Sequence, residues 1–330
     1  MKLSICIPTW NRAEKLKECL NKFISQIVEL EDEVEIIVSD NASTDNTKDI
    51  MYELCSKHGF IKYFSNEVNL GFDGNFLSLI NYANGEYIFF CSDDDVLLEE
   101  GLRKILNIIK QNEEFSLLSL NYYSFKGTNP KIKYVTYKSS GKDIYFNDPN
   151  EHIKFVSYNL GFISSIVINA REAKTIIKGE KIKDSIGSGF VQISLMLSAL
   201  STDKRSVWVG DYIIAQRTDT GGWFPLKYFA YELPRIYLSF QDKGYTEHAV
   251  KKVINEALLK LVLPGLIAWR CNYGDEEVIK TKKLIVDTHS KNPLFWFAIY
   301  PFYIIPRPLL KFPFTIMRYC KRRLKGVNQT

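Results

Sequence analysis

The sequence lacks the features by which disulfide-rich, zinc-binding and repeat proteins are identified. Its six cysteines are scattered and none forms a C-x-x-C pair, so their spacing indicates neither a zinc site nor a redox-active dithiol. No low-complexity tract and no internal repeat is evident along the 330 residues. A hydrophobic content of 46% is ordinary for a globular protein, and the length suffices for one large domain with a smaller addition.

The sequence also has no long hydrophobic run of the kind that spans a membrane. Residues 294–305 are twelve uncharged side chains, of which six are aromatic. A spanning helix needs about 20 apolar residues, and Pro301 interrupts this run. No signal peptide is recognised at the start, because Met1 and Lys2 lead directly into a strand pattern. We therefore expect a cytoplasmic protein with reduced thiols.

Acidic residues are absent beyond Asp287, which gives the carboxyl-terminal segment a charge of its own. Eight of the 43 basic residues lie there, so residues 1–287 contain 35 basic and 38 acidic side chains although the whole chain has a net charge of +5. Basic residues beside Trp, Phe and Tyr are typical of a peripheral anchor on an anionic membrane surface. A buried helical pair with a solvated tail is the alternative. The acidic body, without a nucleic-acid-binding motif, argues against nucleic acid as a partner.

What the sequence does contain is an alternation of strand and helix patterns. Apolar runs typical of strands occur at residues 3–7, 34–38, 60–64, 87–91, 115–120, 162–169, 207–209 and 212–215. Helical spacing of apolar residues separates the first of them, and such alternation with short connections predicts an α/β fold with a single Rossmann-like, mostly parallel sheet flanked by helices. We expect this domain to cover residues 1–225. Residues 226–330, which turn helical and increasingly apolar, are expected to form a helical extension.

Polar clusters follow three of the predicted strands, at residues 8–12, 40–45 and 92–95. In a parallel sheet, ligands bind at the carboxyl ends of the strands. Because all three clusters stand at such ends, we expect them to converge on one edge of the sheet and to form a binding site there.

The sharpest of these clusters is the run of three carboxylates Asp93, Asp94 and Asp95, which we call the aspartate turn. It follows a fully apolar strand pattern at residues 87–91, so its carboxylates are expected at the sheet edge. Mg²⁺ and Mn²⁺ take one or two carboxylates together with substrate phosphates. The turn therefore predicts a site for Mn²⁺ or Mg²⁺ beside a diphosphate. A solvated helix cap, favoured by the helix dipole, is the alternative.

Asp40 ends the second predicted strand, where two roles are open. It can cap a turn with Asn41 and Ser43, or it can accept hydrogen bonds from a nucleobase or ribose, as acidic residues at this position do in dinucleotide-binding folds. No G-x-G-x-x-G follows the first strand; the sequence there is P-T-W-N-R, which argues against a dinucleotide site.

Four segments in this order resemble family 2 glycosyltransferases, which have the GT-A fold. They are SICIPTWNR at residues 4–12, EIIVSDNASTD at 35–45, NLGFDGN at 69–75 and GEYIFFCSDDD at 85–95. The S-D-D-D form of the last segment looks like the abequosyltransferase-type branch, which builds bacterial surface polysaccharides. The resemblance covers about 95 residues, and its four ordered segments are highly specific.

The resemblance implies an inverting transfer of a sugar from a nucleotide-diphosphate sugar to a glycan acceptor, which we expect to be lipid-linked and held at the inner face of the cell membrane. Asp95 would be a direct metal ligand, together with Asp94. The residues that would bind the donor are Pro8, Thr9, Asn11, Arg12, Asp40, Asn69, Asp73, Asp93 and Asp94.

The sequence departs from the family pattern in two places. The commoner motif is D-x-D-D, and Ser92 stands in place of its first aspartate. The family often places an acidic pair at the start of a helix after the later strands, whereas the helix predicted at residues 190–200 begins without an acid. The nearest acid is Asp184, which we expect to be the general base. A solvated loop aspartate is the alternative, and Asp211 and Asp219 are weaker candidates.

A Gly-rich segment at residues 217–223 suggests a mobile loop near the donor. Arg217 could contact the diphosphate and Trp223 could stack on a sugar of the acceptor, although a surface loop without function is equally compatible. A rival on the same fold, a nucleotidyltransferase, usually has a Gly-rich basic loop after the first strand, and that loop is absent. The missing helix-start acid keeps open a degenerate, non-catalytic homologue that binds glycan or partner proteins.

Overall fold

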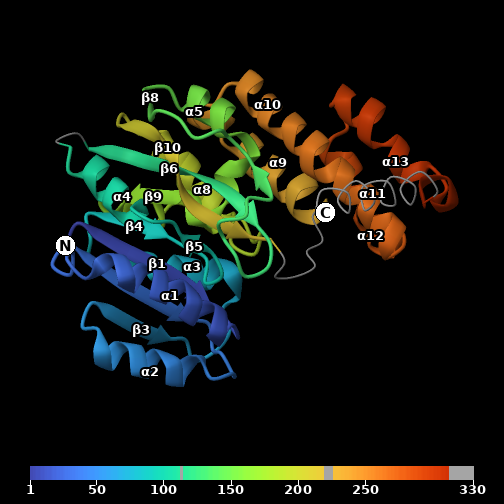
Figure 1. The fold of residues 1–330 in the computed structure, drawn as a ribbon. Coiled ribbons are helices and arrows are strands. Elements are labelled where there is room, and N and C mark those ends of the chain that lie inside the picture. Colours follow the sequence, from blue (N-terminus) through green and yellow to red (C-terminus); the bar gives the residue numbers. More distant parts are fainter. Residues whose placement is uncertain (112–113, 219–225, 312–330) are drawn as a thin grey trace, which may run out of the picture. The chain divides into compact units, whose positions relative to one another are not determined.

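The computed structural model describes residues 1–111, 114–218 and 226–311 (Figure 1). The chain divides into two compact units, which are described in turn. The first unit comprises Met1–Gly221 with Asp242–Tyr245, and the second comprises Gly222–Gln241 with Thr246–Thr330. The short 3₁₀ turn η4 (Gln241–Lys243) lies where the sequence passes between them.

The first unit is built on a ten-stranded sheet with the strand order β3-β2-β1-β4-β9-β6-β10-β5, in which β7 also pairs with β6 and β8 with β10. Strands β3, β2, β1 and β4 are parallel, β6 and β10 are parallel, and β9 runs antiparallel between β4 and β6. The strands are β1 (Leu3–Thr9), β2 (Val34–Asp40), β3 (Ile61–Ser65), β4 (Tyr87–Phe90), β5 (Val96–Leu97), β6 (Phe115–Phe125), β7 (Val135–Thr136), β8 (Ile144–Phe146), β9 (Ile166–Asn169) and β10 (Arg205–Arg217).

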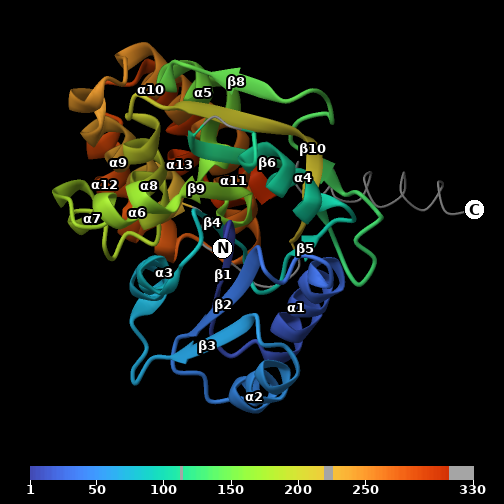
Figure 2. The ribbon, with the colours of Figure 1, turned by 90° about the vertical axis from the view of Figure 1, so that its left-hand side faces the viewer.

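Helices cover both faces of this sheet. Figure 2 shows α1 and α2 on one side of strands β1, β2 and β3, and α3 on the other. The helices of this unit are α1 (Ala13–Ile27), α2 (Thr47–Lys57), α3 (Gly71–Tyr82), α4 (Gly101–Ile109), α5 (Pro149–Val156), η1 (Ser157–Gly161), η2 (Ile163–Ser165), α6 (Ala170–Ile176), α7 (Glu180–Lys183) and α8 (Val191–Leu200). The observed layers confirm the predicted α/β fold.

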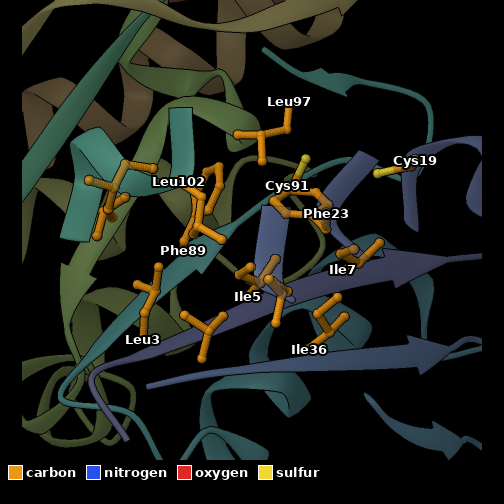
Figure 3. Packing of buried hydrophobic residues seen from close by; sticks show 14 of the residues in the cluster. Leu3, Ile5, Ile7, Cys19, Phe23, Ile36, Phe89, Cys91, Leu97 and Leu102 are labelled. Carbon is orange, nitrogen blue, oxygen red and sulfur yellow. The ribbon is translucent and has the colours of Figure 1, made fainter. Parts of the chain in front are cut away.

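Strands β1 and β2 are buried along their length because helices cover both faces, which is why their sequences are nearly continuous apolar runs. Figure 3 shows Ile5 and Ile7 of β1 beside Ile36 of β2. Phe23 of α1 meets Phe89 of β4 edge to face, with ring centroids 5.9 Å apart. Each large side chain buried in this way stabilises the fold by roughly 1.5–3 kcal/mol, and the packing holds the strand ends in place.

Two strands are longer than the sequence predicts. The apolar pattern predicts a strand that ends at residue 120, whereas β6 continues to Phe125; likewise the two short strands predicted at 207–209 and 212–215 are one strand, β10. Buried polar residues explain the difference: the Asn121 amide donates to the Gly210 carbonyl oxygen at 2.8 Å, which satisfies both groups inside the sheet. A Cβ on Gly210 would lie 2.2 Å from the Gly141 carbonyl oxygen, so the bulge there requires glycine.

The second unit is helical in its described part. Its elements are η3 (Leu226–Glu232), α9 (Leu233–Ser239), α10 (Glu247–Ala257), η5 (Leu258–Val262), α11 (Leu263–Asn272), α12 (Glu276–Thr288), η6 (Phe295–Ile299) and α13 (Pro301–Ile304). The π-helical turns η3, η5 and η6 each precede a proline by two residues, and a wider turn relieves the clash between a proline ring and the carbonyl group one turn earlier. Within the described residues, the helices are too short or too polar to cross a bilayer.

Candidate functional site

The ends of β1 and β4 are joined to each other by a side-chain hydrogen bond. Thr9, the last residue of β1, donates its hydroxyl to Asp93 Oδ2 at 2.8 Å. Thr9 also pairs in register with Asp40, the last residue of β2. The structure therefore brings all three polar clusters of the sequence together at the carboxyl edge of the sheet.

Arg12 bridges two carboxylates of the aspartate turn. Its Nη1 lies 3.1 Å from Asp93 Oδ1 and 2.9 Å from Asp94 Oδ2. Burial raises the pKa of Asp93 to about 6; the charge of Arg12 lowers that pKa, and the neighbouring charge of Asp94 raises it. The turn thus concentrates negative charge in a poorly hydrated place, where a cation is strongly favoured.

Asp95 is the most enclosed of the three aspartates. Its Oδ2 accepts a hydrogen bond from the hydroxyl of Ser164, and its Oδ1 accepts one from the backbone N–H of Arg217 at 2.9 Å. Burial and, after it, the charge of Asp94 raise the pKa of Asp95. Ser164 also accepts from the backbone N–H of Ser92 at 2.8 Å, so it holds both ends of the turn. Ser164 was not predicted from the sequence. The available signal was a pair of serines directly before a buried strand.

The carboxylates of the aspartate turn provide only some of the ligands that a divalent cation takes. Among the described residues, no group of three or more His, Cys, Asp or Glu side chains is arranged to hold a metal ion. Each oxygen of Asp94 and Asp95 accepts one hydrogen bond from the protein, and a carboxylate oxygen has a second lone pair to offer. Two such carboxylates match the one or two that Mg²⁺ or Mn²⁺ takes beside substrate phosphates. Asp94 and Asp95 would be the ligands, and Arg12 now occupies one oxygen of Asp94.

Asp40 makes a turn contact, which is one of the two roles that the sequence left open for it. Its Oδ1 accepts from the backbone N–H of Ser43 at 2.9 Å, and its Oδ2 accepts from the Tyr63 hydroxyl at 2.6 Å. Burial and the nearby Asp40 carboxylate raise the pKa of Tyr63, so this phenol stays a donor. Tyr63, on β3, was not found from the sequence. Recognition of the nucleotide by Asp40 stays a prediction.

The loops after β1, β2 and β3 are tied together by two asparagines. Asn11, in a left-handed conformation with φ of 53°, donates its backbone N–H to Ser43 and accepts from the Thr44 N–H at 2.7 Å. Asn41 donates to the Asn69 side-chain oxygen at 2.8 Å. Pro8 stands in β1 immediately before Thr9. The structure places along one edge four residues that were expected to bind the donor, namely Pro8, Thr9, Asn11 and Asn69.

Asp73 contacts the segment that leads into α8, and its role in donor binding stays a prediction. It lies in the first turn of α3, and its Oδ2 accepts from the backbone N–H groups of Gly187 and Gly189 at 2.8 and 2.9 Å. Its Oδ1 accepts from the N–H of Val191, the first residue of α8, at 3.3 Å. A buried carboxylate from a distant helix therefore holds the loop that follows Asp184.

We expect Asp73→Asn to lower the free energy of unfolding by about 2–3 kcal/mol, because an asparagine amide cannot accept at both positions and hydrogen bonds to a charged group contribute about 1.5–3 kcal/mol each. Urea denaturation followed by circular dichroism measures this. Asp49→Asn is the control, since Asp49 is exposed in the first turn of α2. Equal midpoints for the wild type and Asp73→Asn would show that the loop is held by other contacts.

The remaining predicted residues are placed as follows. Asp184 is exposed and directly follows α7. Asp211 lies on β10 and forms an ion pair of 3.3 Å with Lys104. Asp219 and Trp223 lie outside the described residues.

Arg217 belongs to a strand and not to the loop in which the sequence placed it. It is the last residue of β10, and its guanidinium is buried against Glu18, at 2.6 Å, and the backbone carbonyl oxygens of Asp94 and Gly127. This pocket satisfies the guanidinium inside the protein, and the backbone N–H of the same residue holds Asp95. The contact of Arg217 with a donor diphosphate stays a prediction. The guanidinium already has protein partners on each side.

Comparison with known protein families and sequences gives consistent matches. The family described as Glycosyl transferase family 2 matches residues 4–168. Abequosyltransferase RfbV of Salmonella typhimurium is 28% identical over 210 residues, which are 61% of this chain and 62% of the relative. A GalNAc(5)-diNAcBac-PP-undecaprenol beta-1,3-glucosyltransferase of Campylobacter jejuni is 35% identical over 116 residues, 35% of this chain and 36% of the relative. The chain thus spans less than two thirds of either relative.

Two solved structures resemble the chain in fold. TarS of S. aureus, residues 1–349 in complex with UDP-GlcNAc, has a TM-score of 0.61 and 18% identity, covering 88% of this chain and 80% of that one. The mannosyltransferase PcManGT of Pyrobaculum calidifontis, in complex with GDP-Man and Mn²⁺, has a TM-score of 0.56 and 14% identity, covering 94% and 87%. At such identities the likeness shows the fold alone, and it confirms the GT-A type that the sequence predicts.

Proposed function

The chain belongs to glycosyl transferase family 2, and from that premise we propose that it is an enzyme that transfers a sugar from a nucleotide-diphosphate sugar to a glycan acceptor in the synthesis of a bacterial surface polysaccharide. The observation that carries the proposal is the contact of Thr9 and Arg12 with Asp93 and Asp94. It unites the first and last family segments at the edge of the sheet where ligands bind in this kind of fold. The abequosyltransferase relative supports a donor of the deoxyhexose or hexose class.

We assign the donor's nucleoside to the edge formed by Pro8, Thr9, Asn11 and Asp40. The acidic turn then lies beside the diphosphate. Mn²⁺ or Mg²⁺, bound through Asp94 and Asp95, would supply the positive charge that a diphosphate leaving group requires. The Mn²⁺ complex of the Pyrobaculum structure supports this assignment.

The proposed transfer is a single displacement that inverts the anomeric centre. The acceptor hydroxyl oxygen forms a bond to the anomeric carbon while the bond from that carbon to the diphosphate oxygen breaks, and the hydroxyl proton passes to a carboxylate. Asp184 is our candidate for that carboxylate. It stands at the beginning of the loop that Asp73 holds through Gly187 and Gly189. Trp223 is proposed to stack on a sugar of the acceptor.

The nucleotide is identified by a thermal-shift panel of UDP, dTDP, CDP and GDP, each with and without Mn²⁺. We expect one nucleotide to raise the melting temperature, and to do so more strongly with the metal, because a ligand that binds only the folded state stabilises it. A panel in which none of the four raises the melting temperature would favour the degenerate homologue, which should bind neither nucleotide nor metal.

Asp40→Ala should then weaken donor binding, with a larger rise in donor KM than fall in kcat, because the side chain contacts the nucleoside in the ground state and the transition state alike. Tyr63→Phe is the informative companion, since it removes the hydroxyl that donates to Asp40 and leaves the Asp40 carboxylate in place. If calorimetry shows that Asp40→Ala binds the donor as tightly as the wild type, Asp40 only forms the turn and does not contact the nucleotide.

We further propose that the acceptor is lipid-linked and that the protein attaches peripherally to the inner, cytoplasmic face of the membrane. The printed name of the Campylobacter relative specifies a PP-undecaprenol acceptor. Phe297 of η6 is 84% exposed and Leu309 is 67% exposed, and the surrounding sequence is basic and contains no acid beyond Asp287. Apolar side chains next to cations suit an anionic lipid surface, where each nearby cation contributes about 1 kcal/mol.

Co-sedimentation with anionic liposomes tests this attachment. The double change Phe297→Ser with Leu309→Ser should weaken binding about tenfold or more for each side chain, since burying a large apolar side chain is worth roughly 1.5–3 kcal/mol. Salt should weaken the binding of the wild type without abolishing it. Ile279→Ser, an equally exposed position on α12 among charges of both signs, is the control. A double variant that sediments like the wild type contradicts the attachment through this segment.

A further inference from the structure

Among the side chains that donate hydrogen bonds to the carboxylates of the aspartate turn, within the described residues, Arg12 is long and partly exposed. The other side chains that donate to the three carboxylates in the described part of the chain are the hydroxyls of Thr9, Ser92 and Ser164. These are short side chains, and Thr9 and Ser164 are buried in the sheet and beside it. The Arg12 side chain is instead long and 41% exposed, while the carboxylates of Asp93 and Asp94 are only 5% and 8% exposed.

The guanidinium compensates a repulsion that the fold itself creates. Asp93 and Asp94 are adjacent buried carboxylates, and their negative charges repel each other. One nitrogen of Arg12 contacts an oxygen of each. Arg12 therefore places a positive charge on the same carboxylates that would bind a divalent cation.

The two cations compete for one atom. A Mg²⁺ ligand oxygen lies about 2.0–2.1 Å from the metal, and Asp94 Oδ2 is already 2.9 Å from Arg12 Nη1. Two positive charges on the same oxygen repel each other, and the repulsion is stronger at a buried oxygen such as that of Asp94 than in bulk water. Asp94 Oδ2 has a second lone pair for a metal, but a metal there would face the positive charge of the guanidinium, so metal binding favours withdrawal of Arg12 from Asp94. The Arg12 side chain is 41% exposed, which leaves the guanidinium a path toward solvent.

We infer that Arg12 is the resident counter-cation of the Asp93–Asp94 pair and that it is exchanged for the metal when the diphosphate of the donor arrives. This inference rests on the proposed function. The diphosphate provides a new negative partner for the released guanidinium, so the ion pair that is broken at Asp94 is replaced by one with the donor. The metal alone should then bind weakly, and metal and diphosphate should each increase the affinity of the protein for the other, as linked ligands must.

The test uses Mn²⁺ alone and Mn²⁺ with inorganic pyrophosphate as probes, and the free Mn²⁺ signal in electron paramagnetic resonance reports binding without any turnover. Arg12→Gln should bind Mn²⁺ alone about tenfold more tightly than the wild type, because the competing charge is gone. Pyrophosphate should tighten Mn²⁺ binding in the wild type and much less in Arg12→Gln. Arg12→Lys, which keeps the charge, should restore the weak binding of Mn²⁺ alone.

Lys15→Gln is the matched control, since Lys15 is a cation on the first turns of the same helix and pairs with Glu18 at 3.6 Å. Its Mn²⁺ affinity should equal that of the wild type. If the wild type binds Mn²⁺ with pyrophosphate but Arg12→Gln binds Mn²⁺ alone no more tightly than the wild type, the exchange is refuted while the proposed function stands. If neither protein binds Mn²⁺ under either condition, the metal site of the proposed function fails as well.

Discussion

Replacing Asp95 by asparagine is expected to lower turnover about 100-fold, the scale of loss when electrostatic stabilisation of a developing charge is removed. The substitution conserves shape, so the oxygen that accepts from the backbone N–H of Arg217 remains. What it removes is one of the three carboxylates at the place where we assign the metal and the leaving diphosphate. Because Asp95 is buried, no mobile solvent charge can substitute for it.

The measurement is kcat in saturating donor and acceptor over a Mn²⁺ titration. Excess EDTA should reduce the wild type to the background rate. Asp32→Asn is the control, since Asp32 is exposed and precedes β2 at the opposite end of that strand. Full activity of Asp95→Asn, or of the wild type in EDTA, would refute the assignment of a metal to this turn.

Removal of the Asp184 carboxylate should have an effect at least as large. Without a base, the acceptor hydroxyl must lose its proton to water, and general-base catalysis contributes typically 10²–10⁴-fold. Asp184→Ala should therefore lose about that factor in kcat. Donor affinity should be unchanged, because the side chain acts on the acceptor.

Glu180→Ala is the matched control for Asp184, because Glu180 is an exposed acid at the start of the same short helix, α7. Single-turnover transfer and donor calorimetry on both variants separate chemistry from binding. Normal transfer by Asp184→Ala would move the assignment to Asp211 or Asp219. Asp211 would first have to leave its ion pair with Lys104.

The sequence alone determined the architecture and the edge at which the site lies. Apolar runs that are buried on both faces predicted the parallel strands, and the polar residues that ended those runs predicted the carboxyl edge, because strand ends are marked by local composition. The turn contact between Asp40 and the Ser43 N–H spans three residues, so it too was open to prediction. The family segments extended this local information to named site residues.

Only the tertiary structure decided which distant residues support that edge. Ser164 reaches Asp95 across 69 positions, Arg217 reaches it across 122, and Asp73 reaches Gly187 across 114. Ser164 lies there because β9 inserts antiparallel next to β4, and Arg217 because β10 pairs with β6 to its last residue. Hydrophobic periodicity indicates that a segment is a strand and which face is buried. Strand order and register depend instead on the simultaneous packing of all the strands, and a local sequence pattern does not specify that packing.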